Sequence, residues 1–404
     1  MLCETDLEWP AAVPGAARRP ALLFYCQHSL GIGHLTRSFA LAAALQRHFR
    51  VVFLNGGRLP PGIPLPEGVD IVDLPPLGMD DGHTVVSRDS RSGVEQAVAR
   101  RRALIEAALR ATRPAVLLVE LFPFGRKKFA GEILALIRGA RQQAGGAARV
   151  VCSLRDILVD ARPDQQHHDD RARWLTDRYF DAVLVHADPA LARLEDSFRP
   201  RMPMRTPVHY TGYVVPQRDA ATPGERGPQL LVSAGGGIVG APLFRAVLAA
   251  RALMRRPMPL RIVAGPFLPD ADWRMLQQAV AGQDSVSLLR QVPDMVAEMR
   301  QARASLSQCG YNTALDIVGA QVPALVVPYA TSTENEQTER ARRLAERGAL
   351  QWLPADRLEP AALAAALDAL QDFHPTAAAL NLDGAACSAA LIRQLSATHE
   401  RLDS

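Results

Sequence analysis

The sequence is poor in cysteine and aromatic residues and has no long hydrophobic run. Its five cysteines stand far apart and form no C-x-x-C pair, which argues against a zinc ribbon or a thioredoxin-like site. No apolar stretch reaches the ~18 residues that span a bilayer. Reduced thiols, and Glu4, Asp6 and Glu8 where a signal peptide would carry positive charge, predict a cytoplasmic protein.

Lysine is nearly absent. Of the 46 basic residues only Lys127 and Lys128 are lysines, so the other 44 are arginines. The formal net charge is only +4 and the basic residues are scattered, so the composition does not predict nucleic-acid binding. With 48% hydrophobic and 22% charged residues, the chain has an ordinary globular composition.

The length of 404 residues exceeds a usual single core and predicts two domains. Short buried strands alternate with helical segments, which predicts α/β domains with parallel sheets covered on both faces. The expected strands are 21–27, 51–54, 116–120, 150–154, 182–186, 229–234, 260–264, 286–289, 304–307 and 324–328. The clearest expected helices are 34–48, 93–111, 130–143 and 385–397.

A polar stretch rich in Pro and Gly interrupts this alternation and reads as a linker. The sequence therefore predicts five segments: a flexible extension at 1–20, a first domain at 21–214, the linker at 215–228, a second domain at 229–383, and a C-terminal helix at 384–404 that packs back on the first domain. Two doubly wound domains would bind ligands between the carboxyl ends of their strands.

A phosphate-binding pattern lies in the second domain. Gly310, Asn312 and Thr313 form a turn between an apolar strand and a helix. Free backbone N–H groups and the helix dipole at such a turn bind phosphate without a charged side chain. Glu336 and Gln337 follow the next buried strand, where they could hydrogen-bond sugar hydroxyls. Together these features indicate a nucleotide-sugar site.

This block, CGYNTALD followed by NEQTERARR, resembles the donor-binding half of the MurG-like glycosyltransferases (family 28, GT-B fold). It is still more similar to a bacterial group of predicted glycosyltransferases in the same superfamily. The resemblance continues through GIGHLTR (31–37), LRDIL (154–158) and YTGYV (210–214) and covers roughly 21–353. It implies two Rossmann-like domains facing a central cleft, an inverting mechanism, and no metal or other cofactor.

His34 is the candidate general base. A helix N-terminus disfavours the imidazolium form and keeps the ring neutral near pH 7. In the family that the chain resembles, the histidine of this motif faces the cleft near the acceptor. The alternative is that His34 only starts its helix. Four further residues are candidates for the acceptor side: Gly31, Gly33, Arg155 and Asp156.

Arg37, in the first turn of the same helix, fits either a phosphate contact on the acceptor side or a solvated helix face. Arg155 and Asp156 could line the cleft or form a buried salt bridge.

The sequence AGGGIVG contains a G-x-G-x-x-G pattern, but the acidic residue that would hold a dinucleotide ribose about 20 positions later is missing. We interpret Gly235, Gly236 and Gly237 as a loop that approaches the donor diphosphate, although an ordinary β–α turn would have the same sequence.

Asp316, one turn into the helix after Thr313, is a candidate for binding the ribose; relatives usually have glutamate there, so this contact or the usual nucleotide is in question. Thr313 and Asp316 could also form a capping box, as could Thr333 and Glu336. By the same resemblance, Arg290, Gln291 and Val292 correspond to the base-binding edge.

Three other stretches attract attention. We expect 167–170, HHDD, to be a polar loop rather than a metal site, and 100–102, RRR, to be a solvated helix face. The stretch 122–129, FPFGRKKF, interleaves aromatic and basic side chains and fits contact with an acceptor or an anionic membrane surface.

Together these features and the resemblance predict a glycosyltransferase. It would move a sugar from a nucleoside-diphosphate sugar, with UDP as the expected nucleotide, to a hydroxyl of a glycan, lipid-linked or small-molecule acceptor. The alternatives are a nucleotide-sugar hydrolase or epimerase, and a non-catalytic nucleotide-sugar-binding protein. We expect no nucleic-acid partner and a cytoplasmic location, with peripheral contact at the inner face of the membrane as a variant.

Overall fold

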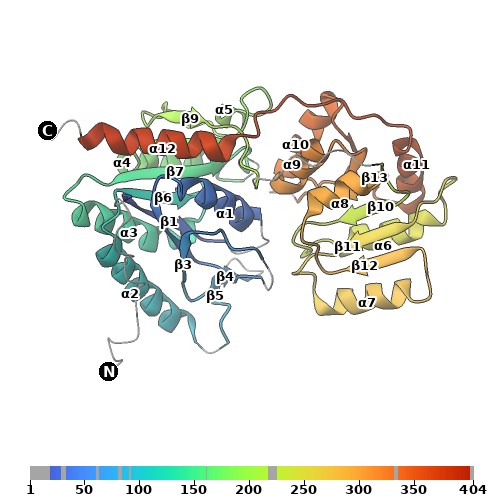
Figure 1. Cartoon of the computed structure of the whole chain (residues 1–404), viewed down its shortest axis with the longest axis horizontal. Helices are drawn as coiled ribbons and strands as arrows, with labels where there is room; N and C mark the ends of the chain where they lie inside the picture. The colour runs from blue at the N-terminus through green and yellow to red at the C-terminus, as the bar shows by residue number, and fades with distance from the viewer. Residues whose placement is uncertain are drawn as a thin grey trace.

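The computed structural model describes residues 19–28, 33–60, 63–80, 84–90, 92–160, 162–216, 225–331 and 335–400. Within them the chain forms two parallel sheets, each with helices on both faces, that lie side by side (Figure 1). Gly31, Thr333, nearly all of the N-terminal extension and the middle of the linker fall outside the described residues.

The first sheet has the strand order β3-β2-β1-β6-β7-β8-β9. Its strands are β1 (Ala21–Cys26), β2 (Arg50–Asn55), β3 (Val69–Asp73), β6 (Val116–Glu120), β7 (Arg149–Arg155), β8 (Ala182–His186) and β9 (Val208–Tyr210). A separate antiparallel hairpin pairs β4 (Leu77–Met79) with β5 (Val85–Ser87). The helices of this half are α1 (Gly33–Leu45), α2 (Val94–Thr112), η1 (Lys127–Phe129), α3 (Ala130–Gln143), α4 (Gln165–Tyr179) and α5 (Leu194–Ser197).

The second sheet has the order β12-β11-β10-β13-β14-β15. Its strands are β10 (Leu230–Ser233), β11 (Leu260–Val263), β12 (Val286–Leu289), β13 (Ala304–Ser307), β14 (Ala324–Val326) and β15 (Gln351–Trp352). Its helices are α6 (Ala241–Arg251), α7 (Asp270–Val280), α8 (Met295–Gln301), α9 (Tyr311–Ala320), α10 (Glu336–Glu346), η2 (Ala355–Arg357) and α11 (Pro360–Leu370).

The C-terminal helix α12 (Gly384–Glu400) lies against the first sheet's layer (Figure 1). It packs on α1, and Ile392 and Ala389 are buried in the same core as Phe39 of that helix. Arg149 of β7 also donates a hydrogen bond from Nε to the carbonyl of Leu395 at 3.3 Å. The chain thus crosses between its two halves twice.

The two crossings touch each other. Val214 and Asp383 form an antiparallel bridge. The N–H of Tyr213 donates to the carbonyl of Asn381 at 2.7 Å, and the N–H of Gly384 donates to the carbonyl of Tyr213 at 3.0 Å. Backbone hydrogen bonds therefore join the outgoing and returning segments where they pass between the sheets.

Candidate active site

His34 and Glu120 meet at the carboxyl edge of the first sheet. Strands β1 and β6 are hydrogen-bonded neighbours, with Tyr25 opposite Val119, so their ends lie together. His34 stands in the first turn of α1, directly after β1, and Glu120 is the last residue of β6. The Nδ1 atom of His34 lies 2.6 Å from Oε1 of Glu120.

The surroundings keep this pair as a neutral imidazole beside a carboxylate. Burial lowers the pKa of His34 to about 3, against the opposing pull of Glu120. Burial alone would raise the pKa of Glu120, but His34, Arg126 and Arg37 outweigh it and hold the pKa well below its usual range. Arg37, itself buried, donates to the same oxygen as His34 at 2.6 Å.

This arrangement selects a tautomer. Since the carboxylate can only accept, the proton of a neutral His34 sits on Nδ1, and Nε2 carries the lone pair. Nε2 makes no hydrogen bond to any described residue, and 16% of the side chain is exposed. Nε2 is thus the atom that can take a proton from a ligand, while Glu120 stabilises the imidazolium that forms.

The second half brings its two glycine-containing turns together. Gly310 caps α9 with extended backbone and no side-chain hydrogen bond to the helix, so the first N–H groups of α9 are not satisfied by a cap. A Cβ atom at Gly235 would lie only 3.9 Å from Oγ1 of Thr313, so the loop after β10 borders this helix start. Gly237 adopts φ 91° against the carbonyl of Ala264. Such paired turns can cradle a phosphate.

These turns face the end of the first sheet. Nδ2 of Asn312 donates to the carbonyl of Gly33, one residue before His34, at 3.2 Å. The hydroxyl of Tyr311 donates to the carbonyl of His186 at 3.1 Å and accepts from the N–H of Val214 at 3.0 Å. The helix start of α9 and the histidine of α1 therefore belong to one site.

Two ion pairs close the site beside these turns. Arg340 donates from Nε and Nη2 to the two carboxylate oxygens of Asp156, each at 2.8 Å, and both side chains are almost fully buried. Arg155 donates to Oε1 of Glu336 at 3.0 Å. Asp156 is therefore a buried salt-bridge residue and not part of an acceptor surface, the second of the two alternatives. Arg155 lies between the two halves and is paired with Glu336.

The side chain of Gln337 makes structural hydrogen bonds to the backbone. Its Oε1 accepts from the N–H groups of Cys309 and Tyr329, each at 3.0 Å, and so ties α10 to the ends of β13 and β14. Asp316 lies half-buried on α9, whose cap is Gly310; Thr313 is not the cap, so the capping-box alternative is wrong there.

The three residues expected at the base-binding edge lie together between β12 and α8. Arg290 stacks on Trp273 at 4.5 Å and donates to Asp270 and to the carbonyl of Leu268, each at 2.8 Å. Val292 packs against the core, and Gln291 stands beside it on the loop.

Four expectations are wrong in whole or in part, three of them because long polar side chains and aromatics are drawn into the interior. Arg37 is buried against Glu120 rather than solvated or free for phosphate. In the expected solvated face 100–102, Arg100 and Arg102 are exposed, but Arg101 is fully buried and donates from Nε to Glu132 at 2.8 Å. The stretch 167–170 is helical, within α4. Phe122, Phe124 and Phe129 are buried core residues, so they offer no membrane surface.

Sequence reasoning missed Glu120, and it pointed to Arg126 only as part of the basic stretch 122–129. The signal for Glu120 was a carboxylate ending an otherwise apolar strand. Arg126 follows in the next loop, with Nη2 3.7 Å from Oε2 of Glu120. No three His, Cys, Asp or Glu side chains among the described residues group as metal ligands. In the same part of the chain, no helix is both long and apolar enough to cross a membrane.

The architecture is that of the GT-B glycosyltransferases, as predicted. A Polygonum tinctorium UDP-glucosyltransferase superposes with a TM-score of 0.59 at 19% identity, over 94% of this chain and 99% of that one. Acinetobacter baumannii MurG superposes with a TM-score of 0.51 at 17% identity, over 93% of this chain and 100% of that one. A UDP-N-acetylglucosamine 2-epimerase described as putative, from Listeria monocytogenes, superposes with a TM-score of 0.56 at 17% identity, over 95% of this chain and 98% of that one. At these identities the likeness concerns the fold.

Residues 236–392 match the glycosyltransferase family 28 C-terminal domain, so the MurG-like resemblance predicted from the sequence is confirmed. The UDP-N-acetylglucosamine–N-acetylmuramyl-(pentapeptide) pyrophosphoryl-undecaprenol N-acetylglucosamine transferase of Alkalilimnicola ehrlichii is 30% identical over 221 residues, 49% of this chain and 60% of that protein. The Ralstonia nicotianae enzyme of the same name is 30% identical, over 46% of this chain and 53% of that protein. The matched part spans little more than half of these relatives.

Proposed function

We propose that this protein is an inverting glycosyltransferase that uses a nucleoside-diphosphate sugar, UDP-linked, and transfers the sugar to an acceptor hydroxyl. The observation that carries the proposal is the His34–Glu120 pair: a neutral imidazole, oriented at 2.6 Å by a buried carboxylate, beside the bare N-terminus of α9. A base and a phosphate cradle at one point are what direct displacement of a nucleotide from a sugar requires.

In the proposed reaction the acceptor hydroxyl gives its proton to Nε2 of His34 while its oxygen bonds the anomeric carbon. The bond from that carbon to the diphosphate breaks, and the nucleoside diphosphate leaves with the electron pair. Gly235–Gly237 and the start of α9 at Gly310–Thr313 stabilise the departing negative charge through backbone N–H groups. One displacement inverts the anomeric configuration.

The names of the relatives support the donor. The curated enzymes are named as UDP-N-acetylglucosamine-dependent transferases, and the Polygonum tinctorium structure is a UDP-glucosyltransferase. Glu336 would read sugar hydroxyls, Asp316 the ribose, and the loop at Arg290–Val292 the base. The acceptor would be a glycan, a lipid-linked precursor or a small molecule. We propose a cytoplasmic location, as well as catalysis without a bound metal.

The first test is a thermal-shift comparison of UDP, dTDP, GDP, ADP, NAD and NADP. A site-specific ligand at a hundredfold excess over its Kd stabilises the fold by about 2.7 kcal/mol. A shift with one nucleoside diphosphate and none with NAD supports the donor site. A shift only with NAD or NADP would sink the proposal.

The alternatives need a second readout. UDP release from a UDP-sugar with water alone, lost in His34→Ala, would favour a hydrolase. Interconversion of two sugars without UDP release would favour an epimerase, the activity named for the Listeria monocytogenes protein of similar fold. Donor binding without turnover under any condition would favour a non-catalytic binding protein.

A further inference from the structure

The buried cluster at the end of β6 carries more positive than negative charge. Glu120 is fully buried, and its two oxygens face two guanidinium groups, Arg37 at 2.6 Å and Arg126 at 3.7 Å. His34 is neutral beside them. One carboxylate thus faces two permanent cations, and an uncompensated charge in a buried site is unfavourable unless a ligand balances it.

Neighbouring carboxylates do not supply the missing charge. Asp156 is held by both arms of Arg340, and Glu336 is paired with Arg155. Each of these pairs is balanced within itself. The excess positive charge therefore remains with Arg126, whose counter-ion Glu120 is already bound more closely by Arg37.

The guanidinium of Arg126 also has unused donors. Its side chain is only 16% exposed. The Nε and Nη2 atoms are buried and have no hydrogen-bond partner among the described residues. Oε2 of Glu120, 3.7 Å from Nη2, also makes no hydrogen bond in the same part of the structure. Arginine presents such N–H groups as a fork that matches the two oxygens of a carboxylate or phosphate.

The backbone is strained at this residue. Arg126 adopts φ 58° and ψ 25°, the left-handed region, which glycine tolerates better than any residue with a Cβ atom. Leu121, at the other end of the same loop, has φ 65°. Non-glycine residues in this conformation concentrate at ligand sites, where the surrounding structure imposes it.

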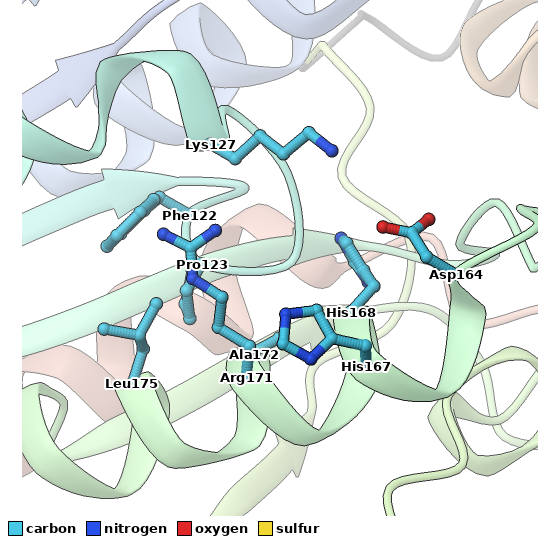
Figure 2. A pocket seen from close by; sticks show the side chains of 9 residues that line it. All are labelled: Phe122, Pro123, Lys127, Asp164, His167, His168, Arg171, Ala172 and Leu175. Carbon is cyan, nitrogen blue, oxygen red and sulfur yellow. The ribbon is translucent and has the colours of Figure 1, made fainter.

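A cavity beside the next residue along the chain, Lys127, is also lined by basic side chains (Figure 2). Lys127 reaches over it from η1, and His167 and Arg171 approach from α4. Neither Lys127 nor Arg171 forms an ion pair within the described ranges, and Asp164 is the one carboxylate that lines the cavity. Its apolar lining includes Phe122, Pro123 and Leu175.

We propose that Arg126 binds an anionic group of the acceptor, a carboxylate or a phosphate, and so holds the acceptor hydroxyl beside His34. The inference rests on the proposed transferase function. The two guanidinium groups lie on different oxygens of Glu120, and this separates the proposed anion from the donor diphosphate. Arg37 is on Oε1, and its Cζ atom lies 5.4 Å from the ring centre of Tyr311 at the start of α9. Arg126 lies on the Oε2 side of Glu120, and the next residue along the chain, Lys127, lines the cavity.

The test measures anion binding by calorimetry with the donor site saturated by UDP. Inorganic phosphate and acetate are the probes, and the variants are Arg126→Gln, Arg126→Lys and the matched control Lys128→Ala, an exposed side chain of the same loop that does not line the cavity. We expect Arg126→Gln to weaken binding of one probe by about tenfold or more, because a charged donor pair is lost. Arg126→Lys should retain part of the affinity, and Lys128→Ala all of it.

Three outcomes would overturn the proposal: no phosphate or acetate binding by the wild type, equal binding by Arg126→Gln, or loss of UDP affinity in Arg126→Gln, which would assign the guanidinium to the donor. If wild-type protein does not bind UDP, the proposed function fails, and the probes alone still decide whether Arg126 is an anion site.

A stability measurement separates binding from a purely structural role. If Arg126 exists to balance Glu120, Arg126→Gly must lower the melting temperature. If it is held for a ligand, Arg126→Gly relieves both the left-handed strain and the excess charge, and the melting temperature should stay the same or rise while anion binding disappears. A lower melting temperature in Arg126→Gly would count against the proposal.

Discussion

Asp156 and Arg340 join the two halves of the molecule by a bidentate ion pair, with both N–O distances at 2.8 Å and both side chains nearly inaccessible to solvent. Arg340 also donates from Nη1 to the carbonyl of Cys309 at 2.9 Å, just before the α9 turn. The pair therefore fixes the start of α9 relative to the first sheet.

Asp156→Ala should destabilise the protein strongly. It leaves the Arg340 guanidinium buried without a counter-ion, a change that typically costs about 3–5 kcal/mol. Denaturant unfolding followed by circular dichroism measures this. The matched control is Glu106→Ala, which breaks the exposed Arg102–Glu106 pair and should leave the midpoint unchanged. Equal midpoints for Asp156→Ala and the control would refute a stabilising role.

Glu120→Gln should remove most of the turnover without touching the donor site. A glutamine can no longer stabilise the imidazolium of His34 or select its tautomer, so we expect a loss of about 10²–10⁴-fold in UDP release from the UDP-sugar. The thermal shift with UDP should persist. Because Arg37 loses its closest counter-ion, the unliganded variant should also melt at a lower temperature. Wild-type turnover in Glu120→Gln would exclude the dyad.

Stability should fall on mild acidification. Burial lowers the pKa of His28, His34 and His186 in the folded protein. Below about pH 6.5 the unfolded chain takes up protons that the folded one refuses, so the free energy of unfolding decreases by up to about 1.4 kcal/mol per pH unit for each histidine. Unfolding at neutral and mildly acidic pH measures the slope. His34→Asn should flatten it; an unchanged slope would contradict the burial of a neutral His34.

Arg155→Ala should change sugar recognition more than nucleotide recognition. In the structure Arg155 donates a hydrogen bond to Glu336, the residue proposed to bind sugar hydroxyls. Removing the guanidinium frees that carboxylate, so we expect UDP-sugar to bind a few times more tightly while UDP binds as before. Calorimetry with both ligands decides. Equal changes for the two would place Arg155 at the diphosphate instead.

The glycine loop offers a matched pair of substitutions. A Cβ atom at Gly237 would lie 2.3 Å from the carbonyl oxygen of Ala264, and the residue has φ 91°. Gly235, at φ 55°, has room for a methyl group. Gly235→Ala should therefore cost only about 1–2 kcal/mol of left-handed strain, whereas Gly237→Ala should destabilise the protein further and abolish the UDP thermal shift. Similar melting temperatures for the two would show that the loop rearranges freely.

The buried strands were predictable because apolar runs of parallel sheets are continuous. The strands at 116–120, 182–186, 286–289 and 304–307 match the expectation residue for residue. Helix α4 was not predictable in this way, because the side it buries includes Asp169 and Thr176 as well as Ala172 and Leu175. The carboxylate of Asp169 accepts from the N–H of Arg199 at 2.9 Å and from Gln165, so polarity there signals internal hydrogen bonds rather than solvent.

The site was predictable where a local motif defines it. The turns at Gly235 and Gly310, and His34 at the start of α1, follow from glycine and helix-start patterns read along the chain. Glu120 lies 86 residues from His34 and meets it only because β6 inserts beside β1. The partner of Asp156 is 184 residues away. Such pairs depend on sheet order and on how the two halves dock, which one sequence does not state.

The paired crossings at Val214 and Asp383 limit how the two halves can move. A single covalent tether would let one lobe swing in any direction about a point. Two antiparallel tethers that are bonded side by side act instead like a door hinge, with one favoured axis. Opening of the cleft should then be a rotation that lifts α9 and α10 away from the first sheet together, so that entry of the donor and release of Arg155 from Glu336 become parts of a single motion.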